Sequence, residues 1–234
     1  MENLPFYVPA MFISTTFLTV GIFLYAIKRH AFSSPTTKVL SFFIPFWLLF
    51  QAVLAISGFY EKTDSIPPRL FLFAVLPFLL TIILLFIFSR KDFIETLSLK
   101  TLTLLHIIRL PVELVLLWLY QHNLVPQLMT FEDRNLDILA GLTAPLIAWL
   151  AFRANKPNRP LLIGWNILGL LLLLNIIVHS ILAFPSPLQQ LAFDQPNRAV
   201  IYFPFIWLPS IVVPIVLFSH LASLWQLIKG TPKP

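Results

Sequence analysis

Three ionisable residues lie inside one apolar stretch of the chain, which runs from Leu102 to Tyr120. They are His106, Arg109 and Glu113. On a helix that turns about 100° per residue, the three side chains fall within a sector of roughly 60°. Ionisable side chains in an apolar helix are costly where they face lipid, so we expect this stripe to face the interior of a helical bundle.

The spacing within the stripe suggests chemistry for each residue. Glu113 is the titratable centre, and Arg109, four residues earlier, can pair with it or clamp an anion. His106 or His220 can accept a proton. Two interpretations stay open: a dry ion pair that only fixes helix packing, or a pair that lines a wet cavity for a ligand or ion.

Further polar residues occur in other apolar stretches. At about 1.5 Å per residue, Gln51 and Asn175 fall near the middle of their stretches, His220 in the inner half and His179 in the outer part. Asp137 falls in the outer part as well, where it can lie at the membrane interface. The depths predict a polar path that runs past the stripe, although Gln51 and Asn175 can equally be interhelical hydrogen-bond partners. The ligand or ion pathway candidates are Glu113, Arg109, His106, His220, Asn175, His179 and Gln51.

Other kinds of site lack their residues. The chain has no cysteine, and its five histidines include no HxxxH or HExxH spacing that puts two ligands on one helix face. No nucleophile elbow and no glycine-rich phosphate loop is present. We therefore expect no metal and no cofactor, and we favour a role other than that of an enzyme.

The composition indicates which kind of secondary structure must hold these polar residues in place. Of the 234 residues, 58% are hydrophobic and only 11% are charged, against about 25% charged in a soluble globular protein. The apolar runs lack the alternation of barrel strands and are long enough to cross the bilayer as helices. The sequence predicts one all-α integral membrane domain over residues 1–234, a bundle of seven transmembrane helices at residues 5–27, 39–59, 70–89, 102–120, 136–152, 160–184 and 199–228.

The basic residues predict the orientation of these helices. Eleven of them lie in loops on one side: Lys28, Arg29, Lys38, Arg90, Lys91, Lys100, Arg153, Lys156, Arg159, Lys229 and Lys233. Only four, Lys62, Arg69, Arg134 and Arg198, lie on the other. By the positive-inside rule the N-terminus is outside and the C-terminus is cytoplasmic. This placement in loops also explains the net charge of +6 and excludes nucleic acid as a partner.

Prolines recur every five residues in the seventh stretch, at Pro204, Pro209 and Pro214. Each removes a backbone donor, and its ring clashes with the carbonyl four residues earlier. The spacing predicts a bend or an unwound turn between Phe203 and Val216.

Three segments carry a resemblance to a known group of proteins: LPVELVLLWLY, PQLMTFEDRNLDILAGLTAP and FDQPNRAVIYFPFIWLPSIVVPIVLFSHLASL. They resemble uncharacterised seven-span bacterial inner-membrane proteins, and the likeness extends over most of the chain. The resemblance implies a multi-pass protein of the inner (plasma) membrane. It implies no activity and no functional residue.

Three hypotheses for function follow. The first is binding or translocation of a small molecule or ion through a polar cavity lined by the fourth helix. The second is a membrane sensor or accessory (assembly) subunit, with a protein partner or a second copy bound through the membrane helices. The third is an intramembrane enzyme that modifies lipid. The lipid bilayer is the one partner common to all three.

Overall fold

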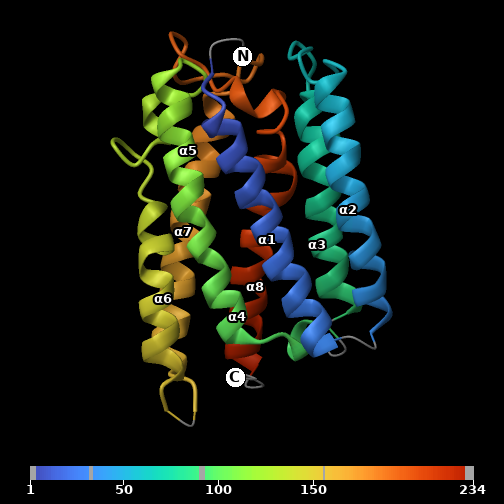
Figure 1. The fold of residues 1–234 in the computed structure, drawn as a ribbon, viewed down its shortest axis with the longest axis vertical. Coiled ribbons are helices and arrows are strands. Elements are labelled where there is room, and N and C mark those ends of the chain that lie inside the picture. Colours follow the sequence, from blue (N-terminus) through green and yellow to red (C-terminus); the bar gives the residue numbers. More distant parts are fainter. Residues whose placement is uncertain (1–3, 32–33, 90–92, 155, 230–234) are drawn as a thin grey trace.

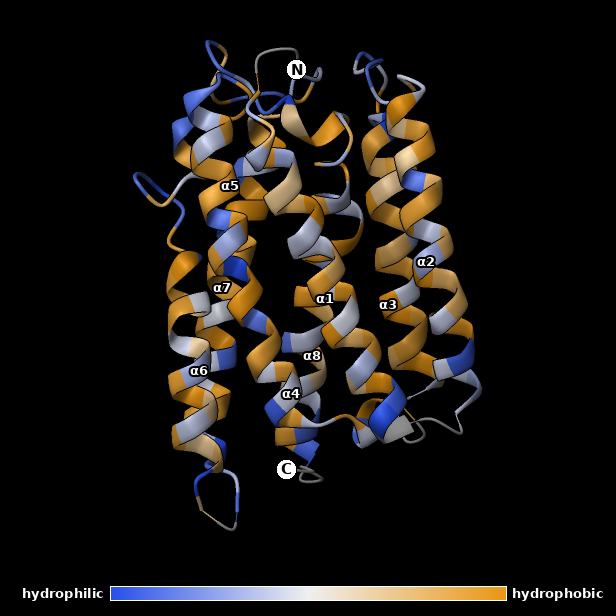
Figure 2. Cartoon of the chain, in the orientation of Figure 1, coloured by the Kyte–Doolittle hydropathy of each residue, from blue (hydrophilic) through white to orange (hydrophobic). Residues whose placement is uncertain are grey.

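The computed structural model describes residues 4–31, 34–89, 93–154 and 156–229. In these ranges the chain folds into helices and irregular segments, with no strand. The helices stand side by side and alternate in direction (Figure 1). Their bodies are apolar, and hydrophilic residues gather at the two ends (Figure 2). Arg90, Lys91 and Lys233 lie outside the described residues.

Within the described ranges, eight α-helices make up the bundle. They are α1 (Tyr7–Ala31), α2 (Pro35–Ile56), α3 (Leu76–Phe88), α4 (Leu99–Leu105), α5 (Arg109–Gln121), α6 (Ile138–Phe152), α7 (Arg159–Leu182) and α8 (Val213–Lys229). The 3-10 turn His106–Ile108 joins α4 to α5 as one continuous span. π-helical turns, Phe71–Val75 and Leu208–Val212, lead into α3 and α8.

Among the described residues, six spans are long and apolar enough to cross a membrane, which indicates a multi-pass membrane protein. In an apolar 18-residue stretch of each span, 67% of the residues are buried in Leu208–Lys229 and 61% in Leu99–Gln121, but only 22% in Phe71–Phe88. The spans that contain α8 and α4–α5 therefore form the centre of the bundle, and α3 lies at its edge.

A further apolar helix, α6, is shorter than these six spans. Its 15 residues give a rise of about 22 Å, less than the roughly 30 Å of a hydrocarbon core. In Figure 1, α6 begins well below the level at which α5 ends. The segment that connects α5 to α6 is packed against the bundle there, with Met129, Thr130 and Asn135 buried. Irregular backbone at membrane depth requires such burial in protein.

The predicted unwound turn in the last span is confirmed, but regular helix begins later than residue 199, the predicted start. Residues 199–207 form a 3-10 turn and other turns, and regular helix starts only after the π-helical turn Leu208–Val212. Pro214 leaves the Ser210 carbonyl without its helical donor, and Trp47 Nε1 of α2 donates to that oxygen at 3.1 Å. A side chain from another helix thus replaces the lost backbone bond.

Candidate functional site

The polar stripe of the fourth span faces the interior of the bundle. His106, Arg109 and Glu113 are exposed by 0%, 2% and 1%, respectively. The 3-10 turn His106–Ile108 lies just before Pro111. In a regular α-helix, the ring of Pro111 would clash with the carbonyl four residues earlier. The chain thereby tightens at the point where the polar stripe begins.

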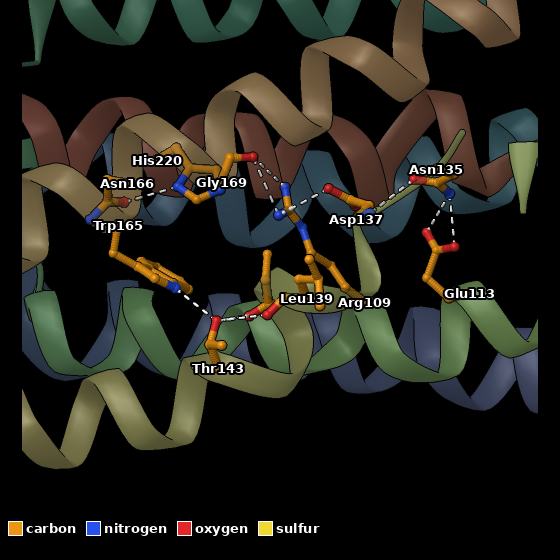
Figure 3. Close-up of polar contacts among 11 residues, drawn as sticks. Arg109, Glu113, Asn135, Asp137, Leu139, Thr143, Trp165, Asn166, Gly169 and His220 are labelled. Atoms are coloured by element: carbon orange, nitrogen blue, oxygen red, sulfur yellow. Dashed lines mark hydrogen bonds and ion pairs between the residues drawn. The ribbon is translucent and has the colours of Figure 1, made fainter. Parts of the chain in front are cut away.

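Arg109 pairs with Asp137, and not with Glu113 as the spacing predicted. Its Nη1 lies 3.1 Å from Asp137 Oδ1, and both side chains are buried. The guanidinium also donates to the Gly169 carbonyl of α7 at 3.3 and 3.4 Å. Asp137 is 5% exposed, because the segment before α6 carries it into the bundle. One buried ion pair thus ties α5 to the start of α6 and to α7 (Figure 3).

Glu113 is held by an amide instead of a cation. Asn135 Nδ2 donates to both carboxylate oxygens, at 2.8 and 2.7 Å. The same nitrogen lies 3.0 Å from the Met129 carbonyl, and Asn135 Oδ1 accepts from the backbone N–H of Asp137 at 3.1 Å. Asn135 therefore joins the two acidic residues in one network (Figure 3).

His106 and His220 stack on each other, with ring centroids 3.9 Å apart and an angle of 25° between the planes. The Asn166 amide donates to the Leu162 carbonyl, so its Oδ1 is free to accept from His220 Nδ1 at 2.9 Å. Gly169 makes room for the ring, because a Cβ there would lie 2.6 Å from His220 Cε1. Stacked rings do not converge on a common ligand position. No group of three or more possible metal ligands occurs in the described ranges.

The remaining candidates lie apart from this network. His179 Nδ1 contacts the Asn175 carbonyl within α7, at 2.9 Å. Asn175 Nδ2 donates to the Arg134 carbonyl at 2.9 Å, so it supports the segment that carries Asn135. Neither side chain makes a hydrogen bond to Glu113 among those of the described residues.

Gln51 supports the π-helical turn before α3. Its Nε2 donates to the Phe73 carbonyl at 2.8 Å, the oxygen left without a helical donor by Pro77. Its Oε1 accepts from the Tyr60 hydroxyl at 2.6 Å. Burial raises the pKa of Tyr60 above its ordinary value. The phenol therefore stays protonated and keeps donating.

A cavity of about 400 Å³ adjoins the acidic end of the network. It lies between α3 with its π-helical turn, α5, α7 and α8, and its wall is almost wholly apolar. Glu113 and Asp137 are the two ionisable residues on that wall. Phe71, Ile181 and Leu188, which also line it, are 39%, 50% and 47% exposed, so the cavity opens at the surface beside them. We expected a polar cavity lined by the fourth span; this one is lined by that span but is apolar.

A protein-family model matches most of the chain. A family described as a domain of unknown function, DUF8737, matches residues 66–228. This range covers every helix that lines the cavity, and the chain belongs to that family. No curated protein and no solved structure matches the chain.

Proposed function

We propose that this member of the DUF8737 family is a membrane protein that binds a lipophilic small molecule in the cavity between α3, α5, α7 and α8. The observation that carries the proposal is the cavity itself. Protein interiors are close-packed, with few voids larger than a water molecule. A volume of about 400 Å³ lies within the range of about 300 to 1,000 Å³ that is usual for ligand pockets.

The character of the wall selects the ligand. Apolar cavities do not hold water well and take up apolar molecules instead. The exposed residues at the opening, Phe71, Ile181 and Leu188, lie among side chains that would face lipid. The ligand would therefore enter sideways from the bilayer, without crossing water.

Binding is favoured over movement of an ion through the bundle because the buried cation, Arg109, is not accessible to an ion. Arg109 is 2% exposed and engaged by Asp137, which suits a packing role that fixes α6 in place. Glu113 differs, because it lies on the cavity wall. We keep it as the titratable centre of the site.

For location we propose the inner membrane, with seven spans, the N-terminus outside and the C-terminus cytoplasmic. The support is the excess of basic residues in alternate loops. A reporter fused after the last residue is expected to read cytoplasmic, and one inserted beside Asn197 to read external. Readings from the same side of the membrane would contradict this topology.

The binding proposal is tested with radiolabelled dibenzyl ether, a neutral two-ring probe, and purified protein in phosphatidylcholine nanodiscs. We expect saturable binding of one probe per chain above the partition into empty nanodiscs. Ile177→Trp fills the cavity wall and is expected to abolish saturable binding. Leu168→Trp on the same helix, at a position that is 57% exposed, is the matched control and should bind normally. Binding that never saturates in the wild type, or that survives Ile177→Trp unchanged, would refute the proposal.

A further inference from the structure

We infer that the ligand of this cavity carries a protonated amine, which pairs with Glu113. The inference rests on the proposed function and adds the chemical class of the ligand. It starts from an imbalance of charge in the network beside the cavity. The network holds two acids, Glu113 and Asp137, and one cation, Arg109. With all three ionised, the sum is one negative charge.

Glu113 is the acid of the network that has no salt-bridge partner among the described residues. Arg109 is engaged by Asp137 at 3.1 Å and by the Gly169 carbonyl. Within the described ranges, no Lys, Arg or His nitrogen lies within 4.0 Å of the Glu113 carboxylate. Its one side-chain partner there, Asn135, is a neutral amide. A carboxylate that is 1% exposed and has no salt-bridge partner among the described residues is unfavourable in its charged form, so the site favours a cation or a proton.

The geometry allows the cation to come from the cavity. Glu113 lies on the cavity wall, and each carboxylate oxygen uses one lone pair for the bond from Asn135. A carboxylate has about four acceptor positions. An ammonium N–H can therefore bond to Glu113 from the cavity while Asn135 keeps its place. Attraction between the two charges is strong there because the surroundings are apolar.

An anionic ligand does not fit the same wall. Arg109, the cation of the network, is not among the residues that line the cavity, and Asp137 already occupies its guanidinium. Two carboxylates on the wall would repel an acidic headgroup. The remainder of the wall is apolar and suits rings or alkyl chains. Together these features describe a lipophilic amine.

The experiment compares two probes of nearly equal shape in the nanodisc assay. Dibenzylamine is protonated at neutral pH, and dibenzyl ether is not. A hydrogen bond to a charged group contributes about 1.5 to 3 kcal/mol, so we expect the amine to bind the wild type roughly 10- to 100-fold more tightly. Glu113→Gln should lose the preference and bind the amine no more tightly than the ether. Glu132→Gln, at an exposed position between α5 and α6, is the control and should keep it.

The outcomes separate the two proposals. If the ether saturates one site and the amine binds no better, the cavity binds ligands but the inference about the amine is wrong. The same holds if the preference survives Glu113→Gln. If Glu113→Gln does not fold, equal binding of the two probes by the wild type is still enough to refute the inference. If neither probe gives saturable binding, the proposed function fails and the inference fails with it.

Discussion

Removal of the Asp137 charge is expected to be the most damaging isosteric change in the bundle. Asp137→Asn keeps the size of the side chain but leaves Arg109 buried without a counter-charge. An arginine cannot become neutral in a protein. Arg109→Gln should cost less, because the Asp137 carboxyl that remains can take up a proton.

The structure fixes the scale of the effect. The two side chains are exposed by only 2% and 7%, and their charged atoms lie 3.1 Å apart. Breaking a buried pair of this kind by removing one partner costs about 3 to 5 kcal/mol. That corresponds to a decrease of roughly 100- to 4,000-fold in the equilibrium constant for folding. The double variant Arg109→Gln with Asp137→Asn should lose only about 1 to 2 kcal/mol, because two neutral amides can bond to each other.

The assay is equilibrium unfolding in mixed micelles, followed by tryptophan fluorescence, for the wild type, both single variants and the double variant. Asp133→Asn is the control. Its pair with Arg134 spans 4.0 Å with side chains that are 44% and 61% exposed, so the change is expected to be within about 1 kcal/mol. A double variant as unstable as the sum of the two singles would show that the charges do not depend on each other, and would refute this reasoning.

Two further predictions concern helix packing. Gly169→Ala should displace the His220 ring and destabilise the protein by about 1 to 3 kcal/mol. Gly164→Ala on the same helix, where nothing lies within 4 Å of the added Cβ, should not destabilise it. Thermal unfolding compares the two variants, and equal effects would contradict the close contact at Gly169. Gln51→Leu should cost about 1 to 3 kcal/mol because it leaves a buried carbonyl of the π-helical turn before α3 without a donor; a variant as stable as the wild type in the same measurement would show that another donor replaces the amide.

Much of the fold could be predicted from the sequence, because apolar runs without charge can satisfy their backbone in lipid only as helices. The start of the last helix was misplaced for a related reason. Residues 199–207 are as apolar as a membrane helix, but they are buried as turns, with Val200 and Phe205 in the core. Hydropathy reports burial, and it does not separate a helix from irregular backbone that protein surrounds. The spacing of Pro204, Pro209 and Pro214 did predict the irregular backbone, which hydropathy could not show.

The candidate site was predicted only in part. The inward stripe of His106, Arg109 and Glu113 follows from helical periodicity alone. The partners of Arg109 and Glu113 could not be found in this way, because Asp137 and Asn135 lie on a connecting segment, and polar residues of such segments usually face water. The one signal in the sequence was the shortness of the apolar run after Asp137. A helix too short to span the bilayer suggests that the preceding segment enters the bundle.

The short α6 also bears on the order in which the protein assembles. In the two-stage description of membrane proteins, helices first insert independently and then pack together. A helix of 15 residues preceded by buried polar groups is a poor candidate for independent insertion. Burial of Asp137 and Asn135 is favourable only when their partners, Arg109 and Glu113, are already in the bundle. We therefore expect α6 to settle after α5 and α7 have inserted, so that its final position depends on side chains of its neighbours.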